Sequence, residues 1–189
     1  MDALLTSIVL VAVAEIGDKT QLLSFVLAAR LRKPWPIIGG IVLATLVNHT
    51  LAGWLGSLLA ASVPPTTLAW IVGISFIVFG LWALHPDALD GSLRVRKAGA
   101  FVTAFVAFFL AEMGDKTQFA TVALAARFDS LALVVIGTTI GMMLANVPAV
   151  WIGEKLALNI PMKAVRIVAA ALFMTVGALT LWSASVPIQ

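Results

Sequence analysis

Hydrophobic residues dominate the chain in six long stretches, separated by short clusters of charged residues and proline. The stretches cover residues 3–29, 35–61, 68–84, 98–126, 131–157 and 164–184. A helix needs about 20 apolar residues to cross a bilayer, so each stretch is a candidate membrane helix. None shows the period-2 alternation that a membrane β-barrel requires. The pattern therefore predicts an all-α integral membrane protein with six transmembrane helices.

The composition agrees with this prediction and excludes several classes of protein. Hydrophobic residues make up 61% of the 189 residues and charged residues only 11%, whereas about a quarter of residues are charged in soluble domains. The length suits one membrane domain and leaves no room for a second, soluble domain. Cysteine is absent, which excludes disulfides and thiolate metal sites. No basic run interleaved with aromatic residues occurs, so nucleic acid is not expected as a partner.

The basic residues outside the two motifs are distributed unevenly between the two predicted faces of the membrane. Nine of them lie at the loops after the first, third and fifth predicted helices: Arg30, Arg32, Lys33, Arg94, Arg96, Lys97, Lys155, Lys163 and Arg166. The opposite face receives only Arg127. The positive-inside rule predicts that the face with nine, called the basic face below, is cytoplasmic. Both termini are then expected outside.

The second half of the chain repeats the first half at an offset of 97 residues, without gaps. Residues 15–21, Glu-Ile-Gly-Asp-Lys-Thr-Gln, align with residues 112–118, Glu-Met-Gly-Asp-Lys-Thr-Gln. Each copy has three predicted helices, an odd number, so the second copy crosses the membrane in the opposite sense. We therefore expect one membrane domain built from two inverted repeats, residues 1–84 and 98–189, joined by a cytoplasmic linker, residues 85–97. Many secondary transporters place their substrate site between such repeats; duplication that merely stabilises a bundle is the alternative.

Four of the nine acidic residues lie in the middle of apolar stretches: Glu15, Asp18, Glu112 and Asp115. Carboxylates at that depth are costly and usually face a cavity. The i, i+3 spacing places the two acids of each motif on one helix face, and inverted copies can bring all four together. Gln21 and Gln118 lie near the aspartates and add amide oxygens. Oxygen donors suit calcium, magnesium or manganese, so these six residues are the predicted cation ligands.

The lysines and threonines of the motifs admit a structural interpretation as well. Glu15 with Lys19, and Glu112 with Lys116, have the i, i+4 spacing of intrahelical ion pairs, which would make the glutamates structural. The aspartates, with no obvious local partner, are then the stronger functional candidates. Thr20 and Thr117 are expected to bond to the backbone of their own helix.

The charge of the predicted cluster indicates exchange. Four carboxylates and two lysines carry a net charge of −2 when ionised, which one divalent cation or two protons would neutralise. Clustered carboxylates exchange metal for protons. The cation is expected as cargo, with no bound cofactor. Asn48 and Asn146, inside the second and fifth helices, either line the pathway or bond to a neighbouring helix, the interpretation we favour.

The doubled Glu-x-Gly-Asp-Lys-Thr motif, in the first and fourth predicted helices, closely resembles that of the GDT-type divalent-cation/proton antiporters, long catalogued as an uncharacterised membrane-protein family. The resemblance covers essentially the whole chain, and both motifs match without departure. It implies exchange of manganese or calcium for protons, with the motif acids as the cation site. Prokaryotic members resemble manganese exporters of the inner membrane. The short linker and the absence of a leader make this chain similar to them.

These observations together predict a secondary active transporter, and not an enzyme, in the inner membrane of a prokaryote. Its expected partners are protons, the lipid bilayer and a divalent cation, Mn²⁺ first and Ca²⁺ next; a homo-oligomer is possible. Two alternatives stay open: a passive divalent-cation channel and a carboxylate-dependent intramembrane enzyme. The mid-membrane depth of the acids disfavours the enzyme, and the inverted repeat favours alternating access over a channel.

Overall fold

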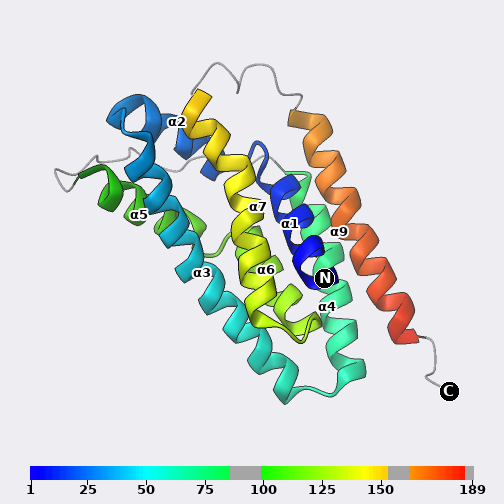
Figure 1. The fold of residues 1–189 in the computed structure, drawn as a ribbon. Helices are drawn as coiled ribbons and strands as arrows, with labels where there is room; N and C mark the ends of the chain where they lie inside the picture. Colours follow the sequence, from blue (N-terminus) through cyan, green and yellow to red (C-terminus); the bar gives the residue numbers. More distant parts are fainter. Residues whose placement is uncertain (86–98, 153–161, 186–189) are drawn as a thin grey trace.

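The computed structural model describes residues 1–85, 99–152 and 162–185, and every regular element in this part of the chain is a helix (Figure 1). The helices are α1 (Asp2–Glu15), α2 (Lys19–Leu31), α3 (Pro34–Ser62), α4 (Pro65–Ala83), α5 (Gly99–Glu112), α6 (Lys116–Arg127), α7 (Leu131–Ile152) and α9 (Met162–Ser185). The linker beyond residue 85 lies outside the described residues, as do Arg94, Arg96, Lys97 and Lys155.

Proline begins two of the long helices. Pro34 opens α3 and Pro65 opens α4, because proline has no N–H to leave unpaired in the first turn and its fixed φ suits a helix start. The turn before α3 is tight: Arg32 takes a left-handed conformation, with φ of 50°, and donates its N–H to the carbonyl of Ala28. These short connections place α2, α3 and α4 one after another as neighbouring segments.

Four helices are long and apolar enough to cross a membrane: Pro34–Ser62, Pro65–Ala83, Leu131–Trp151 and Arg166–Ser185. They coincide with the second, third, fifth and sixth predicted helices, although the predicted end of the fifth, residues 153–157, lies outside the described residues. The predictions of continuous helices over residues 3–29 and 98–126 are wrong. Each of these stretches is divided at its acidic motif into two shorter helices, α1 and α2 in one case, α5 and α6 in the other.

Helix contacts in the two halves of the chain correspond to each other at the 97-residue offset. Helix α1 packs against α7 as α5 packs against α3, and α2 packs against α7 as α6 packs against α3. Two glycines permit equivalent close approaches in the two halves. A Cβ at Gly40 would lie 2.5 Å from the carbonyl oxygen of Phe101, and one at Gly137 would lie 2.8 Å from that of Leu4. Gly137 lies 97 residues after Gly40, and Leu4 lies 97 residues before Phe101.

The apolar core forms two clusters, and the chain passes from one to the other at each motif. One cluster joins α1, α4, α6, α7 and α9 and contains Phe76 and Phe173, whose rings stack with centroids 6.1 Å apart. The other joins α2, α3, α5 and the end of α7 and contains Leu27, Ile41 and Phe108. The acidic motifs therefore occupy the junctions between two apolar bodies, where the ends of four short helices meet.

Candidate cation site

Each acidic motif forms a tight turn that separates two helices. In the first motif Ile16 has φ −63° and ψ 114°, Gly17 has φ 80°, and the N–H of Asp18 donates to the carbonyl of Glu15 over 3.1 Å. These are the angles of a type II turn, whose third residue needs positive φ and hence glycine. The second motif repeats the turn, with φ of 74° at Gly114 and a 3.1 Å bond from Asp115 N–H to the Glu112 carbonyl. Both helices are thus broken in the same way.

The residues after each turn start a new helix. Asp18 is the N-cap of α2 and Asp115 that of α6. Gln21 Oε1 accepts a 2.7 Å hydrogen bond from Gly17 N–H, and Gln118 Oε1 accepts one of the same length from Gly114 N–H. An aspartate followed three residues later by glutamine is the signature of a capping box. This signal, placed directly after a glycine, is in the sequence, and the prediction of continuous helices missed it.

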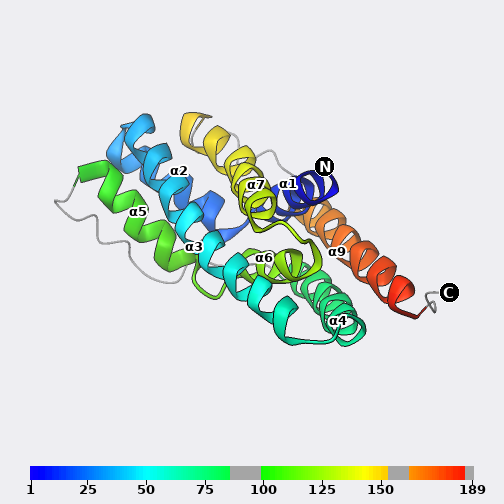
Figure 2. The ribbon, with the colours of Figure 1, turned by 60° about the horizontal axis from the view of Figure 1, so that its bottom comes forward.

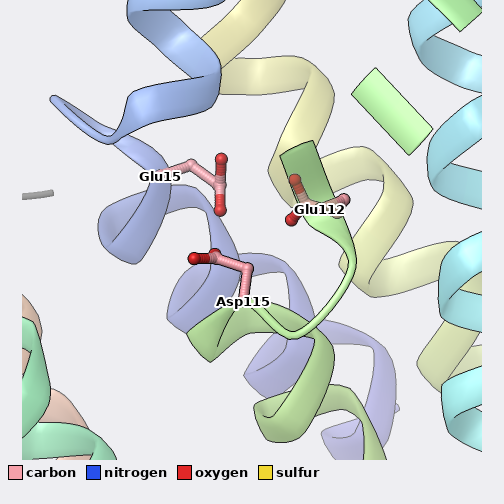
Figure 3. Close-up of side chains that lie close together, drawn as sticks. All are labelled: Glu15, Glu112 and Asp115. Carbon is pink, nitrogen blue, oxygen red and sulfur yellow. The ribbon is translucent and has the colours of Figure 1, made fainter. Parts of the chain in front are cut away.

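Three carboxylates converge at the break. Glu15 ends α1, Glu112 ends α5 and Asp115 begins α6, and each contributes a carboxylate oxygen to a group whose members all lie within 4.8 Å of one another. Figure 3 shows the three side chains directed toward a common space. All three are buried, with exposed fractions of 1% or less. Two residues from one repeat and one from the other meet here, whereas the sequence predicts that all four motif acids form one group.

Asp18, the fourth predicted ligand, lies beside this group in an ion pair with the opposite motif. Lys116 Nζ is 2.8 Å from Asp18 Oδ1, and Lys19 Nζ is 2.8 Å from Asp115 Oδ1. The aspartates therefore have charged partners, contrary to the expectation that they have none nearby. The i, i+4 Glu–Lys geometry of a continuous helix is lost because the turn falls between the two residues. Each lysine instead links its own motif to the other one.

The threonines bond to the glutamates rather than to their own helix backbone. Thr20 Oγ1 donates to Glu15 Oε2 over 2.5 Å, and Thr117 Oγ1 donates to Glu112 Oε1 over 2.6 Å. The expectation of backbone bonds is wrong, because the turn swings the glutamate back over the first turn of the next helix. The remaining oxygens, Glu15 Oε1 and Glu112 Oε2, are buried and have no hydrogen-bond partner among the described residues. A buried carboxylate oxygen in this condition needs a proton or a cation.

Hydrogen bonds from the glutamines and asparagines link the broken segments to neighbouring helices. Gln21 Nε2 donates to the Ala145 carbonyl over 3.0 Å, and Gln118 Nε2 donates to Asn48 Oδ1 over 3.4 Å. Each Oε1 accepts a hydrogen bond from a glycine N–H, so the glutamines stabilise the turns, and their role as cation ligands stays a prediction. Asn48 Nδ2 also donates to the Phe109 carbonyl over 3.2 Å, which fits the helix-bonding interpretation of this residue.

Ser24 contributes to the polar contacts around the first break, and the sequence analysis missed it. Its hydroxyl donates to Asn146 Oδ1 over 2.7 Å, while Asn146 Nδ2 donates to the Met142 carbonyl over 3.0 Å. The signal available for it is the repeat, because Thr121, its equivalent at the 97-residue offset, is also a buried hydroxyl residue. Asn146 therefore links α2 to α7 just beyond the first break.

Comparisons with known proteins point to one family. The family model described as "Divalent cation/proton antiporter GDT1" matches residues 3–91 and 100–187, segments that begin 97 residues apart. A Vibrio cholerae protein named "Putative manganese exporter" is 53% identical over 175 residues, which cover 92% of this chain and 88% of the relative. A GDT1-like protein of Synechocystis is 27% identical over 205 residues, covering 97% and 98% of the two chains. The GDT1-like protein 3 of Arabidopsis thaliana is 27% identical over 201 residues, covering 92% of this chain and 68% of the relative. No solved structure matches the chain.

Proposed function

The chain belongs to the GDT1 family of divalent cation/proton antiporters, and from this premise we propose that it is a secondary active transporter exchanging a divalent cation for protons. We propose Mn²⁺ as the first substrate and Ca²⁺ as the second. The Vibrio relative, by its name, supports manganese and the direction of export. The chemistry of the site supports both ions, because carboxylate oxygens suit each of them.

One observation carries the proposal: Glu15 Oε1 and Glu112 Oε2 are buried with no hydrogen-bond partner among the described residues, and their carboxyl groups belong to a set whose oxygens lie within 4.8 Å of one another. Ionised carboxylates at this separation repel strongly when no cation lies between them. A divalent cation placed among Glu15, Glu112 and Asp115 would neutralise this group, and so would protons. The same oxygens can accept either ligand but not both at once, which is the physical basis of exchange.

The lysines complete the charge balance of the proposed cycle. With Lys19 and Lys116 paired to the aspartates, the four carboxylates and two lysines carry a net charge of −2. One divalent cation or two protons makes the cluster neutral, so the loaded site is uncharged in both halves of the exchange. An uncharged site lowers the energy barrier to the conformational change. A site of fixed charge would favour one ligand permanently. The proposed stoichiometry is therefore two protons for each cation.

The proposed architecture is six membrane crossings in two inverted repeats. Helices α1 and α2 form one broken crossing, α5 and α6 form another, and α3, α4, α7 and α9 are the other four. The correspondence of helix contacts at the 97-residue offset supports this arrangement. Broken helices whose ends meet at a central site are a recurring feature of secondary transporters. With the basic face cytoplasmic, both termini lie outside a prokaryotic inner membrane.

Transport by the purified protein in liposomes tests the proposal. With the lumen acidic, external Mn²⁺ should accumulate against its own gradient, Ca²⁺ should follow more weakly, and Mg²⁺ should serve as the comparison ion. The matched control is Asp129→Asn, which removes an exposed acid in the α6–α7 connection, and it should transport normally. A passive channel would let Mn²⁺ equilibrate without accumulation, and accumulation that is independent of the pH difference would contradict proton exchange.

A further inference from the structure

The pair formed by α4 and α9 covers only part of the candidate site. The two helices pack against each other, α9 also packs against α1, and α4 against α6. Aromatic contacts stabilise the α4–α6 interface, where the Phe119 ring centroid lies 6.4 Å from that of Phe79 and 6.2 Å from that of Trp82. Helices α2 and α5 pack instead against α7, α3 and each other. Figures 1 and 2 show them at the end of the molecule away from α4 and α9.

This packing distinguishes the two faces of the proposed membrane domain. In the six-crossing arrangement, α1 and α6 run between the site and the face of the termini, whereas α2 and α5 run between the site and the basic face. The α4–α9 pair therefore closes the site toward the face of the termini. The 97-residue offset exchanges α1 with α5, α2 with α6, and α4 with α9. When this exchange of helices is applied to the packing seen here, the α4–α9 pair closes the site toward the basic face instead.

Exposure differs between equivalent residues in the way an open basic face requires. Lys19, the first residue of α2, has a side chain 22% exposed, while its equivalent Lys116 is 5% exposed. The turn residue Gly114 is exposed, while its equivalent Gly17 is half-buried. Two copies with the same sequence motif thus have different surroundings. The α4–α9 pair accounts for this difference, because it packs against α1 of the first copy and α6 of the second, the two half-crossings on the side of the termini.

A small pocket leads from the inner ends of α4 and α9 to the motif residues. It is lined by Ala83 of α4, by Arg166 of α9, and by Asp18 and Lys116. Its volume of about 10 Å³ accommodates roughly one water molecule. The pocket connects the Asp18–Lys116 pair with the helix ends that belong to the basic face. It is the route we expect for protons or a cation on that side.

Resting on the transporter function proposed above, we infer that α4 and α9 are a moving gate and that this structure is the state open toward the basic face. The offset identifies the contact that forms when the gate closes that face. Phe119 corresponds to Leu22 and Trp82 corresponds to Leu179, so Leu22 and Leu179 meet in the second state. Here Leu22 is 36% exposed and Leu179 is 61% exposed, so both side chains have room to form this contact. The two residues are gate residues for transport and do not touch the cation.

Cross-linking of introduced cysteines tests the gate, and the chain has no cysteine of its own. One double variant, Trp82→Cys with Phe119→Cys, reports the state described here. The other, Leu22→Cys with Leu179→Cys, reports the second state. Val176→Cys with Leu22→Cys, the equivalent of the Phe79–Phe119 contact, replaces the second variant if that one does not fold. A short bifunctional thiol reagent that is cleavable by reductant is applied to each protein in liposomes.

We expect both pairs to cross-link, and each cross-link to stop Mn²⁺ uptake until reductant restores it. Leu51→Cys with Leu179→Cys, two exposed positions on helices α3 and α9 that no state brings together, is the control and should not cross-link. Cross-linking of the first pair alone, in a protein that transports Mn²⁺, would overturn the gate. Failure of the parent protein to transport would refute the proposed function instead, while the two cross-links would still report whether both packings exist.

Discussion

Replacing Glu112 with glutamine isolates the charge of one proposed ligand from its shape. Glu112 ends α5, and one of its oxygens lies within 4.8 Å of carboxylate oxygens of Glu15 and Asp115. Glutamine has the same size and can still accept the Thr117 hydroxyl, which donates to Glu112 Oε1 over 2.6 Å. Glu112→Gln should therefore fold normally. It changes the net charge of the ionised cluster from −2 to −1.

The geometry sets the size of the effect. Two unit charges 4.8 Å apart repel by about 3.5 kcal/mol at an effective dielectric constant of about 20. In the parent protein this repulsion is relieved when a cation or protons bind, and in the variant there is less repulsion to relieve. Loss of one charge-assisted contact costs about 1.5–3 kcal/mol, which corresponds to a roughly 10- to 100-fold weaker Kd for Mn²⁺. Mn²⁺ uptake should fall accordingly.

Calorimetric titration of Mn²⁺ into the purified variant and the parent protein measures this change. Asp129→Asn is the control, because it removes the same charge at an exposed position outside the site, and its Kd should match that of the parent. Thermal unfolding without metal checks that Glu112→Gln is folded. A folded Glu112→Gln protein with the parent Kd would refute the assignment of Glu112 as a ligand, and with it the three-carboxylate group.

Two further predictions concern topology and the turns. Cysteine introduced at Thr66, in the α3–α4 region, should react with a membrane-impermeant thiol reagent in intact cells. Cysteine introduced at Lys33 should react only after lysis. The reverse pattern would invert the proposed orientation. Gly114→Ala should destabilise the protein by about 1–2 kcal/mol through its φ of 74°, since among the described residues only its chain neighbours lie within 4 Å of the added Cβ. Gly99→Ala, at φ of 82° with equally open surroundings, carries the same strain away from the site. Transport lost in both variants alike would show that the turn at Gly114 has no special role.

The long helices could be predicted from the sequence because their signals are local. Helix α3 spans Pro34–Ser62 where the apolar stretch covers residues 35–61, since proline and polar residues mark both ends. The convergence of acids from two repeats also followed from the sequence, because the offset places Glu15 and Glu112 at equivalent positions.

The interior of the site could not be predicted in the same way. Residues 15–21 are mostly polar, but the apolar residues on both sides make residues 3–29 look like one membrane span. That length conceals the break at Gly17, whose positive φ appears only in the turn geometry. The pairing of Lys19 with Asp115 depends on how two repeats dock, and spacing within one helix contains no information about that. A closer examination of Asp18 and Gln21 as a capping box would have located the break.

The central claim is that metal and protons compete for the same carboxylates, and one measurement tests it most directly. Mn²⁺ is titrated into the purified protein in weakly buffered solution at a series of pH values, and both the Kd and the protons released are recorded. Since protons occupy the carboxylates at low pH, the affinity should weaken as the pH falls, by up to about 100-fold per pH unit where two protons are exchanged. About two protons should then be released for each Mn²⁺ bound. A Kd that stays constant between about pH 6 and pH 8, with no proton release, would contradict the account.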